Sequence, residues 1–343
     1  MGATKDDGSV EVEAAGRPVR ISSPAKVFFS ARGETKLDLV RYYLAVEEQV
    51  MRQMRDRPVM MQRFPDGAGG KSFFQKRVPD FAPDWLTSVD VRTVNGTTSR
   101  ALVIADIAHL VWAVNLGCIG FHAWPVRAPR VDDVDELRID LDPGPGTDWA
   151  MVRDAAVVVR EFFAAHGTTA FAKTSGSRGV HVYVRLEPGH DGFAVRRAAV
   201  AIARALERQN PELLTSAWWK EERGARIFVD FNQNAPHKTV FGAWSARAFA
   251  HAPVSFPVSW ERLTSIDPHS MTISTVPDDV AEHGDAWSAI DDVRHPLAPY
   301  LAMADDDEAA GLPDAPWPPE YPKMAGEATR VAPSRARAPR NAT

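Results

Sequence analysis

Apolar and polar residues alternate in two short segments at the centre of the chain, which predicts two β-strands. Leu137–Asp142 and Arg226–Phe231 each place apolar side chains on one face and polar side chains on the other. Phe171–Arg185 predicts a strand, a glycine turn and a second strand. The polar faces of these strands are where candidate chemistry should be sought.

Helical periodicity is equally clear. After Thr35, whose hydroxyl can cap a helix with Asp38 as capping-box partner, apolar residues recur at helical spacing as far as Val50, interrupted by Glu47. Three more helices are predicted, at Asp106–Leu116, at about Trp149–His166 after the cap residue Asp148, and from Phe193 to about Gln209. Alternating helices and strands predict a mixed sheet with helices packed on it.

The two ends of the chain have a different character. Residues 1–17 are small and charged without periodicity, so we predict disorder there, followed by one folded domain over residues 18–300. Residues 301–343 run from an acidic stretch through several prolines to an arginine-rich end. This predicts an extended strap held by Trp317 and Tyr321, and a mobile basic tail that either contacts DNA or only aids solubility.

The overall charge does not favour nucleic-acid binding, because 45 acidic residues outnumber 40 basic ones and give a net charge of −5. The charge is unevenly distributed, however. Between Met51 and Arg77 the chain has seven basic residues and two acidic ones, enough for a local DNA-binding surface. The single cysteine, Cys118, fits a reducing cytoplasm, and neither a membrane-spanning run nor a secretory signal is expected.

Three aspartates are the strongest chemical signal. Asp140 and Asp142 share one strand face, with Cα atoms roughly 6.5–7 Å apart. A divalent cation would relieve their repulsion, and Asp230 on another strand edge would complete a two-metal site for phosphoryl transfer. The alternative is a solvated strand face with acids there by chance.

A loop of small residues offers a phosphate cradle. Lys173–His181 (KTSGSRGVH) contains Ser175, two glycines and Arg178, so its backbone N–H groups and hydroxyls could surround phosphate oxygens. A plain β-hairpin turn is the alternative. After Asp230, Lys238 and Arg247 could neutralise a triphosphate, although isolated cations are usually surface residues.

Two further features concern rings and cations. Phe73 and Phe74 lie among Lys71, Lys76 and Arg77, a pattern typical of surfaces where bases stack on aromatic rings; core packing of one phenylalanine is the alternative. A lone histidine such as His122 is usually a core residue, and without a second His or Cys at ligand spacing a zinc site is not expected.

Three motifs follow one another along the chain: DLDPG (140–144), TSGSRGVH (174–181) and FVDFNQN (228–234). In this order they resemble the polymerase domain of bacterial DNA ligase D and its stand-alone primase-polymerase relatives. The resemblance covers roughly residues 19–300. The resemblance implies an α+β fold with mixed, mostly antiparallel central sheets flanked by helices and a primase-like, RRM-like catalytic core. It also implies extension of a primer 3′-hydroxyl with NTPs or dNTPs and two Mn²⁺ or Mg²⁺ ions.

The resemblance assigns roles residue by residue. The metal ligands would be Asp140, Asp142 and Asp230. The incoming nucleotide would contact His122, Ser175, Arg178, Arg223, Gln233, Lys238 and Arg247. Phe73, Phe74 and Lys76 would contact the template, Lys26 and Lys36 would bind a downstream 5′-phosphate, and the loop 93–100 would position DNA ends.

The chain departs from the family at two positions that bear on DNA binding. Ser23 stands where the family often has Asn, and Gln62 stands at a position that is usually basic. No ligase signature or nuclease-like His cluster is found, so a separate ATP-dependent DNA ligase is expected to seal the product, with an end-binding protein as a further partner. The favoured prediction is filling of short 5′-phosphorylated gaps. End joining at double-strand breaks, a non-catalytic DNA-end-binding module and a nuclease are the alternatives.

Overall fold

The computed structural model describes residues 8–94 and 96–323. Two six-stranded sheets form its centre. The first sheet contains β5 (Pro58–Arg63), β6 (Phe73–Gln75), β7 (Ser88–Arg92), β8 (Thr98–Val103), β9 (Cys118–Ala123) and β17 (Val240–Phe241). The second contains β12 (Glu136–Pro143), β13 (Phe171–Thr174), β14 (Val180–Arg185), β15 (Leu214–Thr215), β16 (Ile227–Asp230) and β18 (Pro257–Val258). All strand pairs are antiparallel except β15–β16, so the predicted fold class is confirmed.

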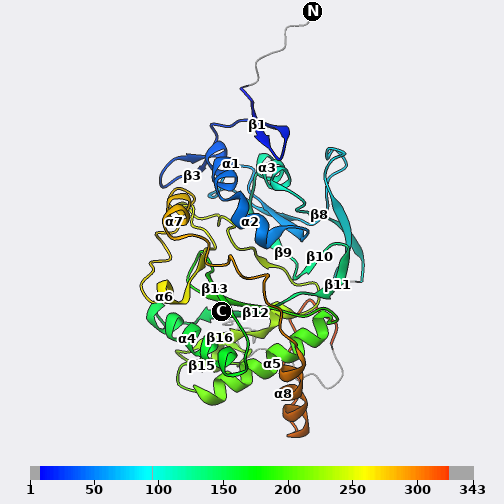
Figure 1. Ribbon diagram of the computed structural model, residues 1–343, viewed down its shortest axis with the longest axis vertical. Coiled ribbons are helices and arrows are strands. Elements are labelled where there is room, and N and C mark those ends of the chain that lie inside the picture. Colours follow the sequence, from blue (N-terminus) through cyan, green and yellow to red (C-terminus); the bar gives the residue numbers. More distant parts are fainter. Residues whose placement is uncertain (1–7, 95, 324–343) are drawn as a thin grey trace, which may run out of the picture.

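Helices cover both sheets, in two halves of the molecule (Figure 1). Near the first sheet lie α1 (Lys36–Ala45), α2 (Glu47–Met54) and α3 (Ile107–Asn115). The second sheet is accompanied by α4 (Trp149–Ala165), α5 (Gly192–Gln209), α6 (Trp260–Leu263) and α8 (Ala298–Ala309), with the 3₁₀ turns η1 (Lys220–Glu222) and η2 (Phe231–Asn234) in the loops. Helix α7 (Val276–His283) lies in the upper half of Figure 1, beside α1. One hydrophobic core extends through both halves.

Capping explains where the predicted helices begin. Thr35 and Asp38 form the expected capping box, and Asp106 and Asp148 cap α3 and α4 with their carboxylates. The stripe that ran to Val50 is not one helix, because the chain leaves helical geometry between α1 and α2. This break turns α2 so that it buries Val50 and three neighbouring residues.

Two predicted boundaries are wrong within the described residues. Residues 10–21 form a hairpin, β1 (Val10–Ala14) with β2 (Arg17–Ile21), because alternate residues of that segment bury their side chains against the core. Residues 10–17 are therefore not disordered. The proposed domain end at 300 falls inside α8. Residues 1–7 and the basic part of the tail lie outside the described residues.

Two smaller two-stranded ribbons complete the fold of the described residues. Strand β3 (Val27–Phe29) pairs with β4 (Glu34–Thr35), and β10 (Val126–Arg127) pairs with β11 (Arg130–Val134).

Strand β12 lies at the centre of its sheet, paired with β14 and β16, and it is buried on both faces. The alternative of a solvated polar face is therefore excluded along most of the strand. Arg138 is 1 % exposed, and its backbone N–H and C=O both bond the side chain of Asn234. Only Asp142, near the strand end, is exposed.

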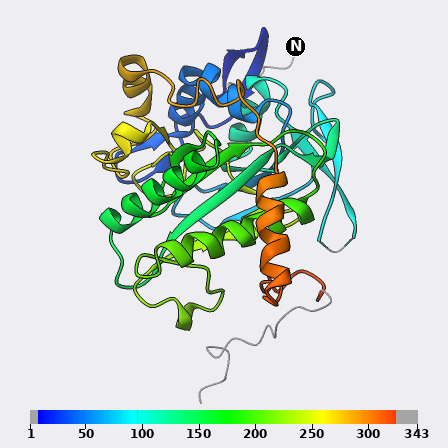
Figure 2. The ribbon, with the colours of Figure 1, turned by 60° about the horizontal axis from the view of Figure 1, so that its bottom comes forward.

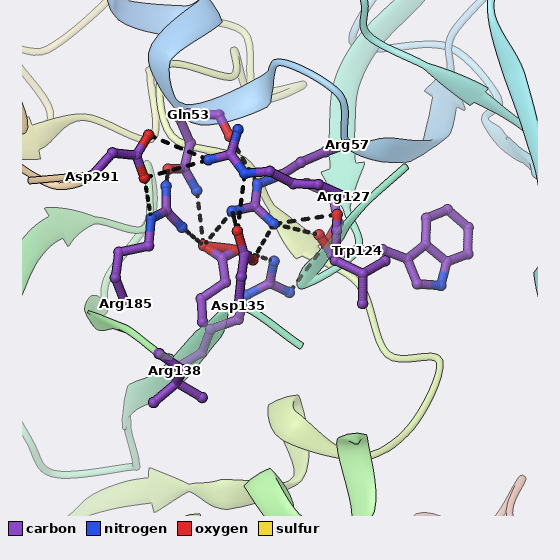
Figure 3. Close-up of polar contacts among 12 residues, drawn as sticks. Gln53, Arg57, Trp124, Arg127, Asp135, Arg138, Arg185 and Asp291 are labelled. Carbon is purple, nitrogen blue, oxygen red and sulfur yellow. Dashed lines mark hydrogen bonds and ion pairs between the residues drawn. The ribbon is translucent and has the colours of Figure 1, made fainter. Parts of the chain in front are cut away.

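A buried cluster of charges joins the two sheets at the other end of β12 (Figure 3). Glu136 accepts hydrogen bonds from Arg138, Arg185 and Gln53, while Arg57 binds the neighbouring Asp135 through two bonds of 2.7 and 3.0 Å. The arginines hold the pKa of Glu136 well below its ordinary value, against the effect of burial. Arg138 also donates to the carbonyl of Ala123 on β9, which fixes β12 against the first sheet.

None of the helices in residues 8–94 and 96–323 is both long enough and apolar enough to cross a membrane.

Candidate polymerase active site

The three predicted metal ligands come together. Asp140 and Asp142 project from β12, and the pairing of β12 with β16 sets Asp230 directly opposite Asp140. One carboxylate oxygen from each lies within 4.8 Å of the others. Three convergent carboxylates suit a hard divalent cation, so the donor set fits Mg²⁺ or Mn²⁺.

The electrostatics of the cluster also fit a cation. Burial, followed by the charges of Asp142 and Asp230, raises the pKa of Asp140 well above its ordinary value. Burial and the charge of Asp142 raise the pKa of Asp230 to about 6. Burial likewise raises the pKa of Asp142, although Arg223, Arg178 and Lys220 oppose that shift. Each carboxylate is thus harder to ionise in this protein than in water, and a bound cation would offset the cost.

A chain of polar side chains supports Asp140 from behind. His181, opposite Asp140 in the β12–β14 register, places Nε2 3.3 Å from the Asp140 carboxylate. The other ring nitrogen lies 3.1 Å from the buried amine of Lys173, which also donates to the Ser255 hydroxyl at 2.6 Å. Lys173 and His181 were predicted only to flank a phosphate-binding loop, because the pairing of β14 with β12 that brings them to Asp140 depends on contacts between distant segments.

The turn η2 orients Asp230. The backbone N–H of Asn232 donates to one carboxylate oxygen at 2.8 Å, and the amide of Gln233 donates to the other at 2.9 Å. Gln233, predicted to contact the nucleotide, therefore bonds a predicted metal ligand and also lines the cavity in front of it.

A cavity of about 330 Å³ opens beside the carboxylates. Its lining includes Asp140, Asp142, His122, Ser175, Arg178, Gln233 and Arg247, together with Thr239 and Phe241, which the sequence did not single out. The Ser175 hydroxyl accepts the backbone N–H groups of Ser177 and Gly179, so it holds the loop closed from within. Arg247 donates to the Ser175 carbonyl at 2.9 Å, and burial lowers its pKa to about 10, so it keeps its charge at neutral pH.

The His122 side chain lines this cavity. Its ring centroid lies 3.9 Å from that of Phe241 and 5.3 Å from that of Phe74. Burial, reinforced by Arg247 and Lys173, lowers its pKa to about 3, so the ring is neutral. Its buried Nε2 has no hydrogen-bond partner among the described residues, which leaves it available to a ligand.

A second, larger cavity of about 750 Å³ adjoins the first and shares His122 and Gln233 with it. Phe73 and Phe74 line it and are 47 % and 52 % exposed, so neither is a core residue. Lys76 also lines it, as do residues of the β7–β8 hairpin that includes the predicted end-positioning loop.

Two predicted nucleotide contacts lie elsewhere. Lys238 lines the larger cavity and forms an ion pair with Glu320, a residue far along the chain. Arg223 stacks its guanidinium 3.5 Å from the Phe228 ring and donates to the carbonyls of Ala217 and Trp218. Arg223 still acts electrostatically on the site, because it is the charge that most strongly opposes the rise in the pKa of Asp142 caused by burial.

The two lysines predicted to hold a 5′-phosphate differ in their surroundings. Lys26 is partly exposed and pairs with Asp66 at 2.9 Å. Lys36 is 6 % exposed and donates to the carbonyls of Ser22 and Asn115 at 2.6 and 3.2 Å. Lys36 thus holds its own loop in place, and Lys26 is the more available of the two cations.

The chain is similar to known proteins over most of its length. Residues 35–287 match the family model described as "LigD, primase-polymerase domain". The chain is 30 % identical over 310 residues to the "Multifunctional non-homologous end joining protein LigD" of Mycolicibacterium smegmatis, covering 89 % of this chain and 40 % of that protein. It is 34 % identical over 248 residues to the protein of the same name from Pseudomonas aeruginosa, covering 72 % of this chain and 29 % of that protein.

A solved structure extends the likeness to three dimensions. The "Polymerase Domain from Mycobacterium tuberculosis Ligase D in complex with DNA" superposes with a TM-score of 0.75 at 30 % identity, over 81 % of this chain and 99 % of that one. The chain spans well under half the length of the curated relatives it matches. Sequence match, fold and clustered carboxylates agree: the chain belongs to the family of LigD primase-polymerase domains.

Proposed function

We propose that this protein is a template-dependent polymerase that adds NTPs or dNTPs to a primer 3′-hydroxyl at gaps or ends of DNA. The observation that supports this most strongly is the placement of three convergent carboxylates beside one cavity suited to a triphosphate and a second, adjoining cavity lined by exposed aromatic rings. Membership of a nucleotidyltransferase family supports the same reaction class.

In this proposal Asp140, Asp142 and Asp230 hold two divalent ions, with Mn²⁺ favoured and Mg²⁺ as the alternative. Such ions would lower the pKa of the primer hydroxyl and neutralise the triphosphate. The three carboxylates fix where the 3′-oxygen meets the α-phosphate, and the bond between the α-phosphorus and the bridging oxygen breaks to release pyrophosphate. His181 and Gln233 keep two of these carboxylates from rotating.

The remaining polar groups bind the substrates. Arg178 and Arg247 lie where they can neutralise the triphosphate, and the neutral His122 can bond the sugar or base of the nucleotide through its free Nε2. Phe73 and Phe74 offer faces on which template bases can stack, with Lys76 near the template backbone. Lys238 would reach a DNA or nucleotide phosphate only after leaving Glu320.

We place the protein in short-gap filling, with Lys26 near the downstream 5′-phosphate, and with a separate ATP-dependent ligase as the sealing partner in the bacterial cytoplasm. The second candidate is polymerisation during double-strand-break joining with an end-binding partner. It is favoured by the relatives named for non-homologous end joining.

The test is primer extension on a labelled duplex with a short 5′-phosphorylated gap, with Mn²⁺ and all four NTPs. The wild-type protein should lengthen the primer. Asp140→Ala and Asp230→Ala should abolish extension but leave the gel shift of the duplex largely intact. Normal extension by either variant would contradict the proposed roles of the carboxylates. To separate the two pathways, the same assay with two overhanging ends measures whether ends are paired and extended as efficiently as gaps.

A further inference from the structure

The segment 312–321, here called the C-terminal strap, follows α8 and lies beyond residue 287, where the family match ends. Helix α8 crosses α5 (Figure 2), and the strap then packs against the segment that follows β16. Trp317 and Tyr321 are 4 % and 7 % exposed and pack on Ala235, directly after the turn η2. The Tyr321 hydroxyl donates to the Pro236 carbonyl at 2.6 Å. The strap therefore covers the segment that follows Asp230.

Arg196 of α5 connects the strap to this turn. Its guanidinium donates to the Asn232 side chain at 2.8 Å and, on the strap, to Asp314 at 3.0 Å and to the carbonyl of Ala315 at 2.8 Å. The Trp317 ring stacks on it, with the guanidinium carbon 3.8 Å from the ring centroid. Arg196 is 1 % exposed. A planar guanidinium with several donors can hold the turn and the strap at once, as a lysine could not.

Asn232 transmits this support to the active site. Its side-chain amide donates to the Pro316 carbonyl of the strap at 3.0 Å, while its backbone N–H donates to the Asp230 carboxylate at 2.8 Å. One residue thus binds the strap, Arg196 and a candidate metal ligand. Partners that orient a metal ligand in this way commonly account for 10–100-fold in metal affinity.

We propose that Arg196 and the C-terminal strap are positioning elements for Asp230, so that the catalytic unit extends to about Tyr321. This inference rests on the proposed metal-dependent function. Arg196 lies within the family match and the strap lies outside it, so the proline-rich segment has a role in orienting a metal ligand rather than in linking the domain to something else.

The experiment measures Mn²⁺ binding directly, by electron paramagnetic resonance of the free ion, with no DNA or nucleotide present. Two changes disrupt the support: Arg196→Met, and truncation after Gly311, which removes the strap. Each has a matched control. Arg197→Met alters the next residue of α5, whose guanidinium pairs with Asp305 and Glu308 of α8. Truncation after Lys323 removes residues beyond the strap. Circular dichroism reports whether each variant is folded.

We expect Arg196→Met and the truncation after Gly311 to raise the Kd for Mn²⁺ by about tenfold, and both controls to stay within about twofold of wild type. A folded Arg196→Met protein with wild-type Mn²⁺ affinity would overturn the inference. If that variant does not fold, Trp317→Leu decides, because it removes only the stacking ring; unchanged affinity there would equally overturn the inference. Asp230→Asn separates the two proposals: if it binds Mn²⁺ like the wild type, the metal site itself is wrongly assigned.

Discussion

Replacing Asp230 by asparagine should stabilise the metal-free protein while removing its response to metal. Asp230 is 8 % exposed, and burial together with the charge of Asp142 raises its pKa to about 6. An ordinary Asp has a pKa near 3.8. The difference of about two units corresponds to about 3 kcal/mol, the amount by which the ionised carboxylate destabilises the fold at neutral pH.

The direction of the pH effect follows from the raised pKa. Below about pH 4 the Asp230 carboxyl is protonated in both the folded and the unfolded protein, so its ionisation does not lower the free energy of unfolding. Between about pH 4 and pH 6 the unfolded protein ionises this carboxyl while the folded protein keeps it protonated, so stability falls as the pH rises, and the full cost is reached above about pH 6. The asparagine side chain of the variant would have no charge and could still accept the Asn232 N–H, but it would lose the bond from Gln233, at a cost of about 1 kcal/mol. We therefore expect a net gain of about 2 kcal/mol at pH 7.

The assay is thermal unfolding of wild type and Asp230→Asn at pH 7 and pH 4, with EDTA or with Mn²⁺. With EDTA at pH 7 the variant should melt about 3 °C higher. At pH 4 this advantage should be gone, and the variant should melt slightly below the wild type because only the loss of the Gln233 bond remains. Mn²⁺ at about 100 times its Kd should stabilise the wild type by about 2.7 kcal/mol and the variant much less. A variant that melts below the wild type in EDTA at pH 7, or that keeps the full response to Mn²⁺, would refute the reasoning.

Four other changes probe the substrate side of the site. Arg178→Met should raise the KM for nucleotide by about tenfold without altering the melting temperature, since it removes a cation from the cavity lining; an unchanged KM in steady-state extension would exclude this contact. Phe74→Ala should weaken binding of a gapped duplex by about 1–3 kcal/mol in fluorescence anisotropy, the usual value of one stacked base, and equal affinity would leave the ring without a role. Lys26→Ala should abolish any preference for a 5′-phosphate over a 5′-hydroxyl. Lys36→Ala should also lower the melting temperature, because Lys36 is buried and bonds two carbonyls. Equal melting temperatures of the two variants would contradict this difference between the lysines.

Local patterns predicted much of the fold because capping and alternation act over a few residues. The capping box at Thr35, the strand β12 and the position of Asp230 on β16 were all readable from neighbouring residues. The hairpin over residues 10–21 was missed because its stability comes from packing on the core, which a short charged segment does not reveal.

The support of the site could not be predicted in the same way. Lys173 lies behind Asp140 only because β14 places His181 between them, and Arg196 meets Asn232 and the strap only after α5 and α8 have packed. The buried cluster around Glu136 likewise joins residues from α2, β12 and β14. In the sequence each of these residues is an ordinary charged or polar side chain. Their roles depend on contacts between distant segments, which periodicity does not encode.

We propose that the carboxylate cluster serves templated nucleotidyl transfer. The most direct measurement gives the protein one NTP at a time, with Mn²⁺, on four 5′-phosphorylated gapped duplexes that differ only in the first template base. We expect the wild-type protein to lengthen the primer by the complementary nucleotide on each duplex, and Asp140→Ala to leave the primer unchanged. A shortened primer would indicate a nuclease, and a shifted but unchanged primer would indicate a DNA-end-binding module; either result would contradict the account.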